Sequence, residues 1–245
     1  MIVFPEYTNN LELQKRNAEF VEKEWESPTR QKIFSYLEES FVQQNPFIVD
    51  IGANVGIFTI KWLDKFPSTV VFAFEPDIDN FEILYYNCRN YVAKWQLVPH
   101  LCGIFYGVSE GKVFGTGDKN PGGLIFEGVD KIHLHPHVGT LVEYNKKIQV
   151  GTLEEIFNNK TMPIVPWLVK MDVEGSEYNI IENSTLLKEV RFLIIEFHGH
   201  NEQYLREYLS VHLPEHHCHV LTNEAYGTDH HYIAFLEKDP ITKEF

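Results

Sequence analysis

The stretch FIVDIGANVGIFTI, residues 47–60, decides the fold of this 245-residue chain. A short apolar run ends in Asp50, two glycines follow with the spacing GxxxG at Gly52 and Gly56, and an apolar segment compatible with a helix comes next. A continuous apolar run is typical of a strand that is buried on both faces of a parallel sheet. The pattern therefore predicts a strand over 47–52, a tight turn, and a helix over about 56–65.

The same alternation continues along the chain. TVVFAFEP, residues 69–76, is an apolar run that ends in Glu75 and Pro76, and a segment with helical spacing follows it. Alternating strands and helices predict a doubly wound α/β sheet with helices on both faces. The other predicted strands lie near 95–105, at 167–172 and 190–198, and in a C-terminal antiparallel hairpin formed by HCHVLTN and HHYIAFLE, with a helix over about 176–188.

The chain is predicted to form a single domain, residues 1–245, because it contains no low-complexity tract or linker. Four parts are expected within it. They are an N-terminal helical extension at 1–46 with helices at 9–25 and 28–42, a cofactor-binding core at 47–198, an insertion at 115–147 that would act as a lid over the acceptor, and a C-terminal helix and hairpin at 199–245.

Charge and composition exclude several classes of partner. The formal net charge is −14 and no run of Lys or Arg offers a basic stripe, so neither nucleic acid nor an anionic membrane surface is an expected partner. Three widely separated cysteines suit a reducing compartment, and no stretch looks like a signal peptide or a spanning helix. A cytoplasmic location is expected, and the oligomeric state stays open.

The glycine spacing and the strand-end acids point to a nucleoside cofactor. GxxxG is not the GxGxxG of dinucleotide-binding proteins, so a pyrophosphate would lack its usual turn. Glu75 ends the second predicted strand, where a carboxylate can accept hydrogen bonds from both ribose hydroxyls. Asp50 can offset a cationic amine or orient the turn. S-adenosylmethionine fits this set, whereas the plain alternative is that Gly52 and Gly56 allow tight packing and Glu75 caps a helix.

Across residues 47–198 the sequence resembles the FkbM-type S-adenosylmethionine-dependent methyltransferases. The segments that carry the resemblance are FIVDIGANVGIFTI, FAFEPDIDNFEILYYN, VGTLEEI, LVKMDVEGSEYNII and FLIIEFH, in the family's order. The resemblance implies a Rossmann-like class I methyltransferase fold, which has a seven-stranded, mostly parallel sheet with a reversed last strand. It also implies methyl transfer to a hydroxyl, often on a sugar or a natural product.

The resemblance also assigns cofactor-binding residues. It implies that Asp50, Gly52, Asn54 and Gly56 form the turn at the methionine end of the cofactor, and that Glu75 holds the ribose. Asn80 and Asn87 match family positions as supports in the following helix. Pro76, at the end of the second predicted strand, and Cys102 and Gly103, near the end of the third, are predicted to complete the cofactor pocket.

Residues 166–177, PWLVKMDVEGSE, supply the candidate catalytic groups. Asp172 ends a strand beside the expected methyl group, and Glu174 follows at the turn. Glu177 falls in the first turn of a helix, where a negative charge meets the helix dipole favourably. His198 ends the neighbouring strand, so Asp172 and His198, with Glu174 as a partner, are predicted to remove the acceptor's proton.

The alternative is that these strand ends bind a divalent cation. Asp172, Glu196 and His198 could bind Mg²⁺ or Mn²⁺, which would activate a hydroxyl. The spacing does not require an ion. Two histidine clusters lack a standard zinc spacing and are interpreted as solvated loop residues, although the first would line the acceptor pocket; they are His133, His135 and His137, and His212, His216, His217 and His219.

These observations predict an S-adenosylmethionine-dependent O-methyltransferase that acts on a small molecule or glycan, most simply a carbohydrate hydroxyl. The reaction would be an in-line displacement with base assistance from Asp172 and His198. Two other functions remain open. One is an NAD-dependent sugar oxidoreductase, which the missing middle glycine and the lack of a Tyr-x-x-x-Lys pair disfavour, and the other is a non-catalytic binding protein, which the retained strand-end acids disfavour.

Overall fold

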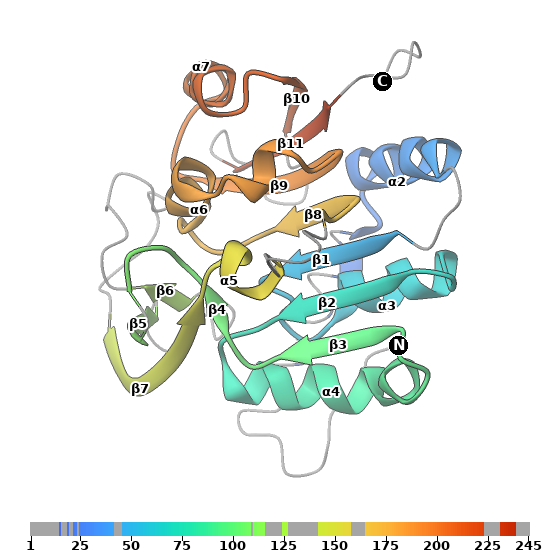
Figure 1. Cartoon of the computed structure of the whole chain (residues 1–245), viewed down its shortest axis with the longest axis vertical. Helices are drawn as coiled ribbons and strands as arrows, with labels where there is room; N and C mark the ends of the chain where they lie inside the picture. The colour runs from blue at the N-terminus through green and yellow to red at the C-terminus, as the bar shows by residue number, and fades with distance from the viewer. Residues whose placement is uncertain are drawn as a thin grey trace.

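The computed structural model contains two β-sheets and the helices that cover the larger one (Figure 1). It describes residues 25–41, 46–108, 110–115, 124–126, 142–157, 165–222 and 231–238, together with positions 15, 19, 22 and 23. The strands of the larger sheet are β1 (Phe47–Ile51), β2 (Val70–Phe74), β3 (Leu97–His100), β8 (Leu168–Met171), β9 (Phe192–His198), β10 (His216–Thr222) and β11 (His231–Lys238).

This sheet has the strand order β10-β11-β9-β8-β1-β2-β3. The pairs β1–β2, β1–β8, β2–β3 and β8–β9 are parallel. The last strand, β11, runs antiparallel between β9 and β10, so the predicted C-terminal hairpin forms the edge of the sheet. The predicted fold class is confirmed: the sheet is seven-stranded and mostly parallel, with a reversed last strand, as the resemblance implied.

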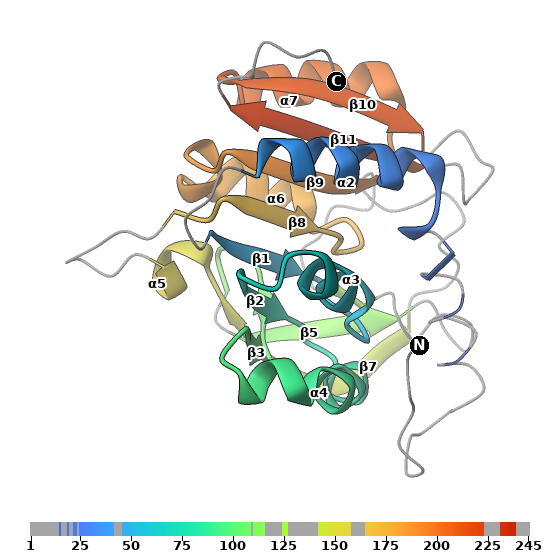
Figure 2. The same ribbon diagram turned by 90° about the vertical axis from the view of Figure 1, so that its right-hand side faces the viewer.

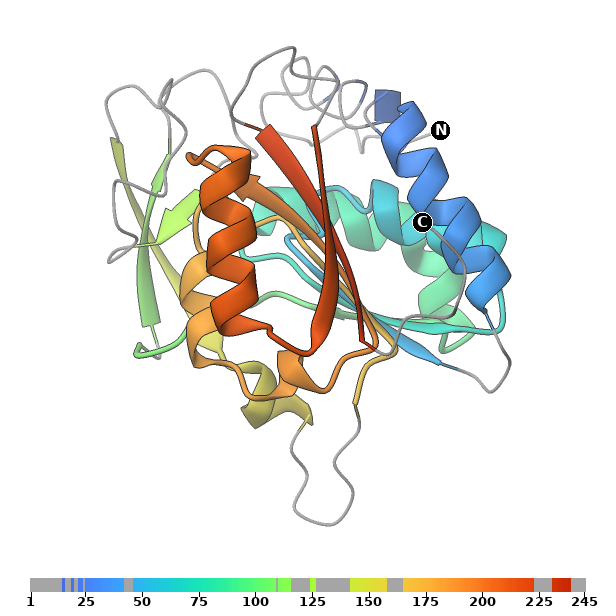
Figure 3. The same ribbon diagram turned by 90° about the horizontal axis from the view of Figure 1, so that it is seen from above.

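Helices cover both faces of this sheet, and a separate apolar core lies between the sheet and the helices on each face. Figure 3 shows α2 (Pro28–Ser40), α3 (Ile57–Lys65) and α4 (Ile78–Ala93) on one side, and α5 (Leu153–Phe157), α6 (Glu177–Asn183) and α7 (Glu202–His212) on the other. Phe34, Trp62 and Leu84 belong to the first core, and Tyr178 and Leu205 to the second. The strands between them are apolar on both faces, as the sequence predicted.

Side-chain caps fix several helix starts. Asp77 precedes α4, and its Oδ1 accepts the N–H groups of Asp79 and Asn80. Before α5, Thr152 and Glu155 each accept the other's backbone N–H, which makes a capping box. These caps fix where the chain enters α4 and α5, directly after residues that end strands.

The smaller sheet has the order β4-β7-β5-β6 and lies beside the carboxyl ends of the parallel strands (Figure 1). One strand was predicted over 95–105, but the chain forms two strands in two sheets. The main-chain groups of Glu75 bond His100 and Cys102 in the last rung beside β2, after which Gly103 pairs with Val150 instead. The strands are β4 (Gly103–Ile104), β5 (Glu110–Gly115), β6 (Leu124–Phe126) and β7 (Val142–Gly151).

The helix predicted over 176–188 is interrupted. α6 ends at Asn183, and Leu186–Lys188 forms a separate 3₁₀ turn. The Glu154 carboxylate, which projects from α5, accepts hydrogen bonds from the N–H groups of Thr185 and Leu186. These contacts replace the helical bonds that those N–H groups would otherwise make.

Helix α2 crosses the sheet next to β9 and β11 (Figure 2). Ser27 caps it by accepting the Arg30 N–H, Pro28 occupies the first turn, and the Tyr36 hydroxyl donates to Glu237 on β11 at 2.6 Å. The helix predicted over 28–42 is therefore present. The helix predicted over 9–25 lies mostly outside the described residues, as do His133, His135 and His137. No helix among the described residues combines the length and apolarity that a bilayer crossing needs.

Candidate active site

A pocket opens at the carboxyl ends of the parallel strands. Its open space is about 400 Å³, which includes solvent at its mouth. Seven of the predicted site residues line it, and they come from the ends of four strands: Gly52, Glu75, Pro76, Cys102, Gly103, Asp172 and Glu174. The other predicted site residues do not line it; they are Asp50, Asn54, Gly56, Glu196 and His198.

The turn after β1 requires glycine at two positions. Gly52 has φ +75°, and a Cβ atom there would lie 1.8 Å from the backbone oxygen of Asp172. Gly56 has φ +91°, and a Cβ atom would approach Cys88 and Leu84 of α4 at 3.2 and 3.3 Å. Both positions therefore need positive φ and close packing. The glycines bring the turn against the end of β8 and against α4.

Glu75 is buried at the end of β2 and faces the turn. Its Oε2 accepts the Asn54 N–H at 2.7 Å, and its Oε1 accepts the Asp77 N–H at 2.9 Å. Burial raises the pKa of Glu75 to about 7, against the effect of these two hydrogen bonds. A carboxylate at this point can still accept hydroxyl donors from the pocket through its remaining lone pairs.

Asp50 faces away from the pocket, behind the turn. It pairs in register with Lys170 of β8, and its Oδ1 lies 3.3 Å from the Lys170 Nζ. The Thr59 hydroxyl donates to its other oxygen at 2.7 Å. Asp50 is completely buried, so of its two predicted uses the structure is consistent with orienting the turn rather than with direct contact to a cationic amine.

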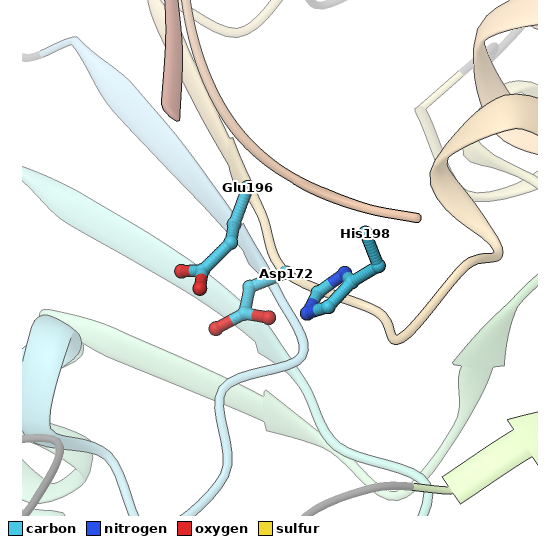
Figure 4. Close-up of side chains that lie close together, drawn as sticks. All are labelled: Asp172, Glu196 and His198. Carbon is cyan, nitrogen blue, oxygen red and sulfur yellow. The ribbon is translucent and has the colours of Figure 1, made fainter. Parts of the chain in front are cut away.

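Asp172, Glu196 and His198 point toward one another where β8 and β9 end (Figure 4). One ligand atom of each lies within 4.8 Å of the other two. Asp172 has a side chain that is 32% exposed, whereas the other two are buried. Asp172 and His198 therefore lie close together, as predicted, although the side chains that contact them are not only the predicted ones.

His198 has its closest charged contact with Glu177. Its Nδ1 lies 2.8 Å from Glu177 Oε1, and its Nε2 lies 3.7 Å from Glu174 Oε2. The opposite oxygen of Glu177 accepts the Gly175 N–H at 2.7 Å. Glu177 was interpreted as a charge at a helix start, and it does bind a backbone N–H there, but it is also completely buried against His198.

The charges around His198 decide its protonation. Burial by itself would lower the pKa of His198, but Glu174 and Glu177 raise it well above its ordinary value. Burial raises the pKa of Glu174 to about 7, although the His198 charge opposes this. Burial and Glu196 raise the pKa of Asp172, although Lys170 and His198 oppose them. The surrounding acids therefore favour the protonated form of His198, and the pKa values of Asp172 and Glu174 both lie above their ordinary values.

Two buried cations that the sequence analysis did not identify neutralise this acidic cluster. Arg30, from α2, places Nη2 2.6 Å from Glu196 Oε2 and stacks its guanidinium over Trp25 at 4.3 Å. Lys170 lies 3.8 Å from Asp172 Oδ2. The Arg30 contact joins residues that are 166 positions apart, so no local sequence pattern predicts it. The lysine inside WLVKMD offered a signal, because charge is rare in a buried strand.

The donor set suits a hard divalent cation in type, since it offers two carboxylates and one imidazole. Glu177 would be the carboxylate that orients the histidine from behind. Arg30 already neutralises Glu196, however, and an imidazolium has no lone pair to offer an ion. Asp172, the partly exposed member of the three, is therefore also suited to base catalysis without an ion.

Comparisons with known proteins show the family of this chain. A family model described as "Methyltransferase FkbM domain" matches residues 50–233. The hexuronic acid methyltransferase AglP of Haloferax volcanii is 28% identical over 164 residues, which cover 66% of this chain and 59% of AglP. Methyltransferase 1 of Beauveria bassiana is 28% identical over 149 residues, which cover 55% of this chain and 57% of that protein. The chain thus matches less than two thirds of the length of either relative.

Solved structures give more distant matches. A precorrin-6y C5,15-methyltransferase from Geobacter metallireducens has 13% identity and a TM-score of 0.46, covering 97% of this chain and 94% of that one. TrmK of M. capricolum, in complex with S-adenosylhomocysteine, has 11% identity and a TM-score of 0.44, covering 84% of this chain and 68% of that one. Similarity at this level assigns no activity.

Proposed function

The chain belongs to the FkbM methyltransferase family, and we propose that it transfers a methyl group from S-adenosylmethionine to a hydroxyl oxygen of a sugar or glycan. The observation that carries the proposal is the meeting of the glycine turn, Glu75 and Asp172 around one pocket. The turn and Glu75 suit the cofactor. Asp172 suits the acceptor, because it is the partly exposed acid at the neighbouring strand end.

We assign the cofactor to the pocket as follows. The turn formed by Gly52, Asn54 and Gly56 takes the methionine end, held in place by Asp50 from behind. Glu75 accepts the ribose hydroxyls, since a buried carboxylate gains most from such donors. Pro76, Cys102 and Gly103 provide the adjoining wall of the pocket.

The proton of the acceptor hydroxyl goes to Asp172 in this mechanism. Transfer of a methyl group from sulfur to oxygen is an in-line displacement, in which the oxygen–carbon bond forms as the carbon–sulfur bond breaks. A base near neutral pKa accelerates this step by about 10²- to 10⁴-fold. Burial and Glu196 raise the pKa of Asp172, which makes it a stronger base than an ordinary aspartate, whereas the acids around His198 favour its protonated form, whose charge would hold Glu174 and Asp172.

Mg²⁺ or Mn²⁺ bound by Asp172, Glu196 and His198 is the second arrangement of the same site. An ion would lower the pKa of the acceptor hydroxyl directly. We favour the base mechanism, because Arg30 holds Glu196 at 2.6 Å and Lys170 approaches Asp172, so cations of the chain already neutralise both carboxylates.

The acceptor is proposed from two observations. One curated relative is named as a methyltransferase of a hexuronic acid, which supports a sugar. The described pocket carries carboxylates from Glu75, Asp172 and Glu174, which suit neutral hydroxyls. We propose that the insertion at 115–147, which follows the pocket residue Ile104 along the chain, contributes the acceptor lid.

Titration calorimetry with S-adenosylmethionine and S-adenosylhomocysteine tests the cofactor. We expect both to bind, and failure of both to bind would contradict the proposal. Release of S-adenosylhomocysteine is then followed with a panel of neutral sugars, hexuronic acids and glycans. Release that depends on a sugar supports O-methylation, and reduction of NAD⁺ by the same panel would favour the oxidoreductase instead.

Catalytic variants separate binding from chemistry. Asp172→Asn and His198→Gln should keep cofactor affinity and lose turnover, because neither side chain is assigned to the cofactor. Glu75→Ala should lose cofactor binding. Turnover that is retained in Asp172→Asn and His198→Gln would instead place the chemistry elsewhere in the pocket.

A further inference from the structure

Lys170 places a buried ammonium between the turn after β1 and the end of β8. It is 5% exposed, and its Nζ donates to the Gly52 carbonyl at 2.8 Å. The same nitrogen lies 3.3 Å from Asp50 Oδ1 and 3.8 Å from Asp172 Oδ2. The contact with Gly52 is a hydrogen bond and the contacts with the two carboxylates are ion pairs, so one ammonium interacts with all three oxygens.

The turn and β8 already touch at this point. The backbone oxygen of Asp172 occupies the space where a side chain on Gly52 would lie. The Gly52 and Ala53 N–H groups donate to Phe74 on β2, so the amide side of the turn is held by one neighbouring strand. Lys170 holds its carbonyl side from the other neighbouring strand. The turn is thus fixed between both strands that flank β1.

We propose that Lys170 is a positioning residue that holds the Gly52 turn against the end of β8 in the shape that binds the cofactor. This inference rests on the proposed function, since it assigns the turn to S-adenosylmethionine. Lys170 itself does not line the pocket and need not touch the cofactor.

A purely structural role explains the contacts less well. Replacing a buried ion pair with packed apolar residues is often neutral or stabilising, so stability alone does not require a charged pair here. Asp50 also accepts a hydrogen bond from Thr59. The hydrogen bond that Lys170 supplies beyond these ion pairs is the one to the Gly52 carbonyl, and it goes to the turn.

The test compares two lysines with the same pattern of partners. Lys238 donates to the Lys188 carbonyl at 2.8 Å and pairs with Glu189 and Glu215 at 3.0 and 3.1 Å. It lies at the opposite end of the sheet, since its N–H bonds Arg191 just before β9 begins. Lys170→Met is therefore matched with Lys238→Met.

S-adenosylhomocysteine is the probe, because it lacks the sulfonium charge. Its affinity therefore reports the shape of the turn rather than the lost charge of Lys170. Its affinity is measured by calorimetry well below the melting temperature of each variant. We expect Lys170→Met to weaken it by about 10- to 100-fold, the effect of one hydrogen bond to a charged group. Lys238→Met should leave it unchanged, and Lys170→Arg should recover most of the loss.

Amide hydrogen exchange supplies the second readout. In Lys170→Met, exchange should accelerate at residues 52–56 while β10 and β11 keep their protection. If Lys170→Met does not fold, Lys170→Gln takes its place, and its shorter, uncharged side chain should weaken the affinity in the same direction.

The outcomes separate this inference from the function. If Lys170→Met binds S-adenosylhomocysteine as tightly as Lys238→Met does, Lys170 is not a positioning residue although the function stands. A wild-type chain that binds neither form of the cofactor contradicts the proposed function itself.

Discussion

Glu75 accepts two backbone N–H groups in the free protein and is the residue assigned to the ribose. Its pKa of about 7 lies above the ordinary 4.5, so Glu75 is protonated below neutral pH and ionised above it. Only the carboxylate can accept both hydroxyls. We therefore expect affinity for S-adenosylhomocysteine to rise about tenfold between roughly pH 6 and pH 8.

Glu75→Gln is the control for this titration. The amide does not ionise, so its weaker binding should show no such rise in the same calorimetric series. A wild-type affinity that is flat across the range would mean that Glu75 does not contact the ribose or is ionised throughout.

Glu177 and His198 form a buried pair, and both residues are almost inaccessible to solvent. Glu177→Gln leaves the imidazolium without its nearest anion, so the free energy of unfolding should fall by about 3–5 kcal/mol. The pair stabilises fully below the unfolded pKa of histidine, about 6.5, and this contribution is lost as pH rises through the raised folded pKa. The deficit should therefore be largest in mild acid and shrink in base.

Denaturant unfolding at several pH values measures that deficit. Glu182→Gln is the matched control, because Glu182 lies on the same helix and meets Tyr208 only at 3.4 Å. It should change stability by less than about 1 kcal/mol at every pH. A Glu177 deficit that is independent of pH would contradict the ion pair.

Asp172, Glu196 and His198 allow a direct test for a metal ion. Because Arg30 and Lys170 already neutralise the two acids, turnover should survive dialysis against a chelator and should not rise when Mg²⁺ or Mn²⁺ is added. The measurement is S-adenosylhomocysteine release with whichever sugar the panel identifies. Loss of activity with recovery on adding either ion would establish the metal arrangement.

At the scale of elements, α2 is part of the site although it precedes the residues that match the family model. It carries Arg30 to Glu196 on β9 and Tyr36 to Glu237 on β11. The N-terminal extension was predicted as a helical addition to the core. The structure makes one of its helices the source of a buried charge in the acidic cluster.

Arg30→Met tests that contribution. It leaves Glu196 buried without its cation, so stability should fall by about 3–5 kcal/mol, and pairing it with Glu196→Met should restore most of the loss. Lys65→Met is the control, because it breaks the exposed Lys65–Glu38 pair between α3 and α2 and should cost less than about 1 kcal/mol. Chemical unfolding measures the three variants against the unsubstituted protein. An Arg30→Met loss no greater than that of Lys65→Met would contradict a buried ion pair.

At the scale of the whole molecule, the net charge of −14 acts on any charged acceptor. An anionic hexuronate is repelled at long range, and salt screens that repulsion over about 10 Å at 0.1 M. The KM of a hexuronate should therefore fall as salt is raised, whereas that of a neutral sugar should not change. Steady-state kinetics with the two acceptors checks this, and a hexuronate KM that rises with salt would indicate a local basic subsite.

Much of the fold was predictable because its signals are local. Continuous apolar runs identified β1, β2, β8 and β9, and the hairpin pattern identified the reversed edge. The division of residues 95–105 between two sheets was not predictable, because it depends on pairing Gly103 with Val150. The interruption after α6 was missed for the same reason, since Glu154 reaches it from another helix.

The sequence by itself determined the order of strand, acid, glycine turn and second acid, and with it the pocket residues Gly52, Glu75 and Asp172. Each lies at a strand end, and parallel strands bring such ends to one edge. Only the tertiary structure decided which charged side chains surround these residues. Arg30 meets Glu196 across 166 residues and Lys170 meets Gly52 across 118, and a contact between such distant positions depends on strand order and helix placement.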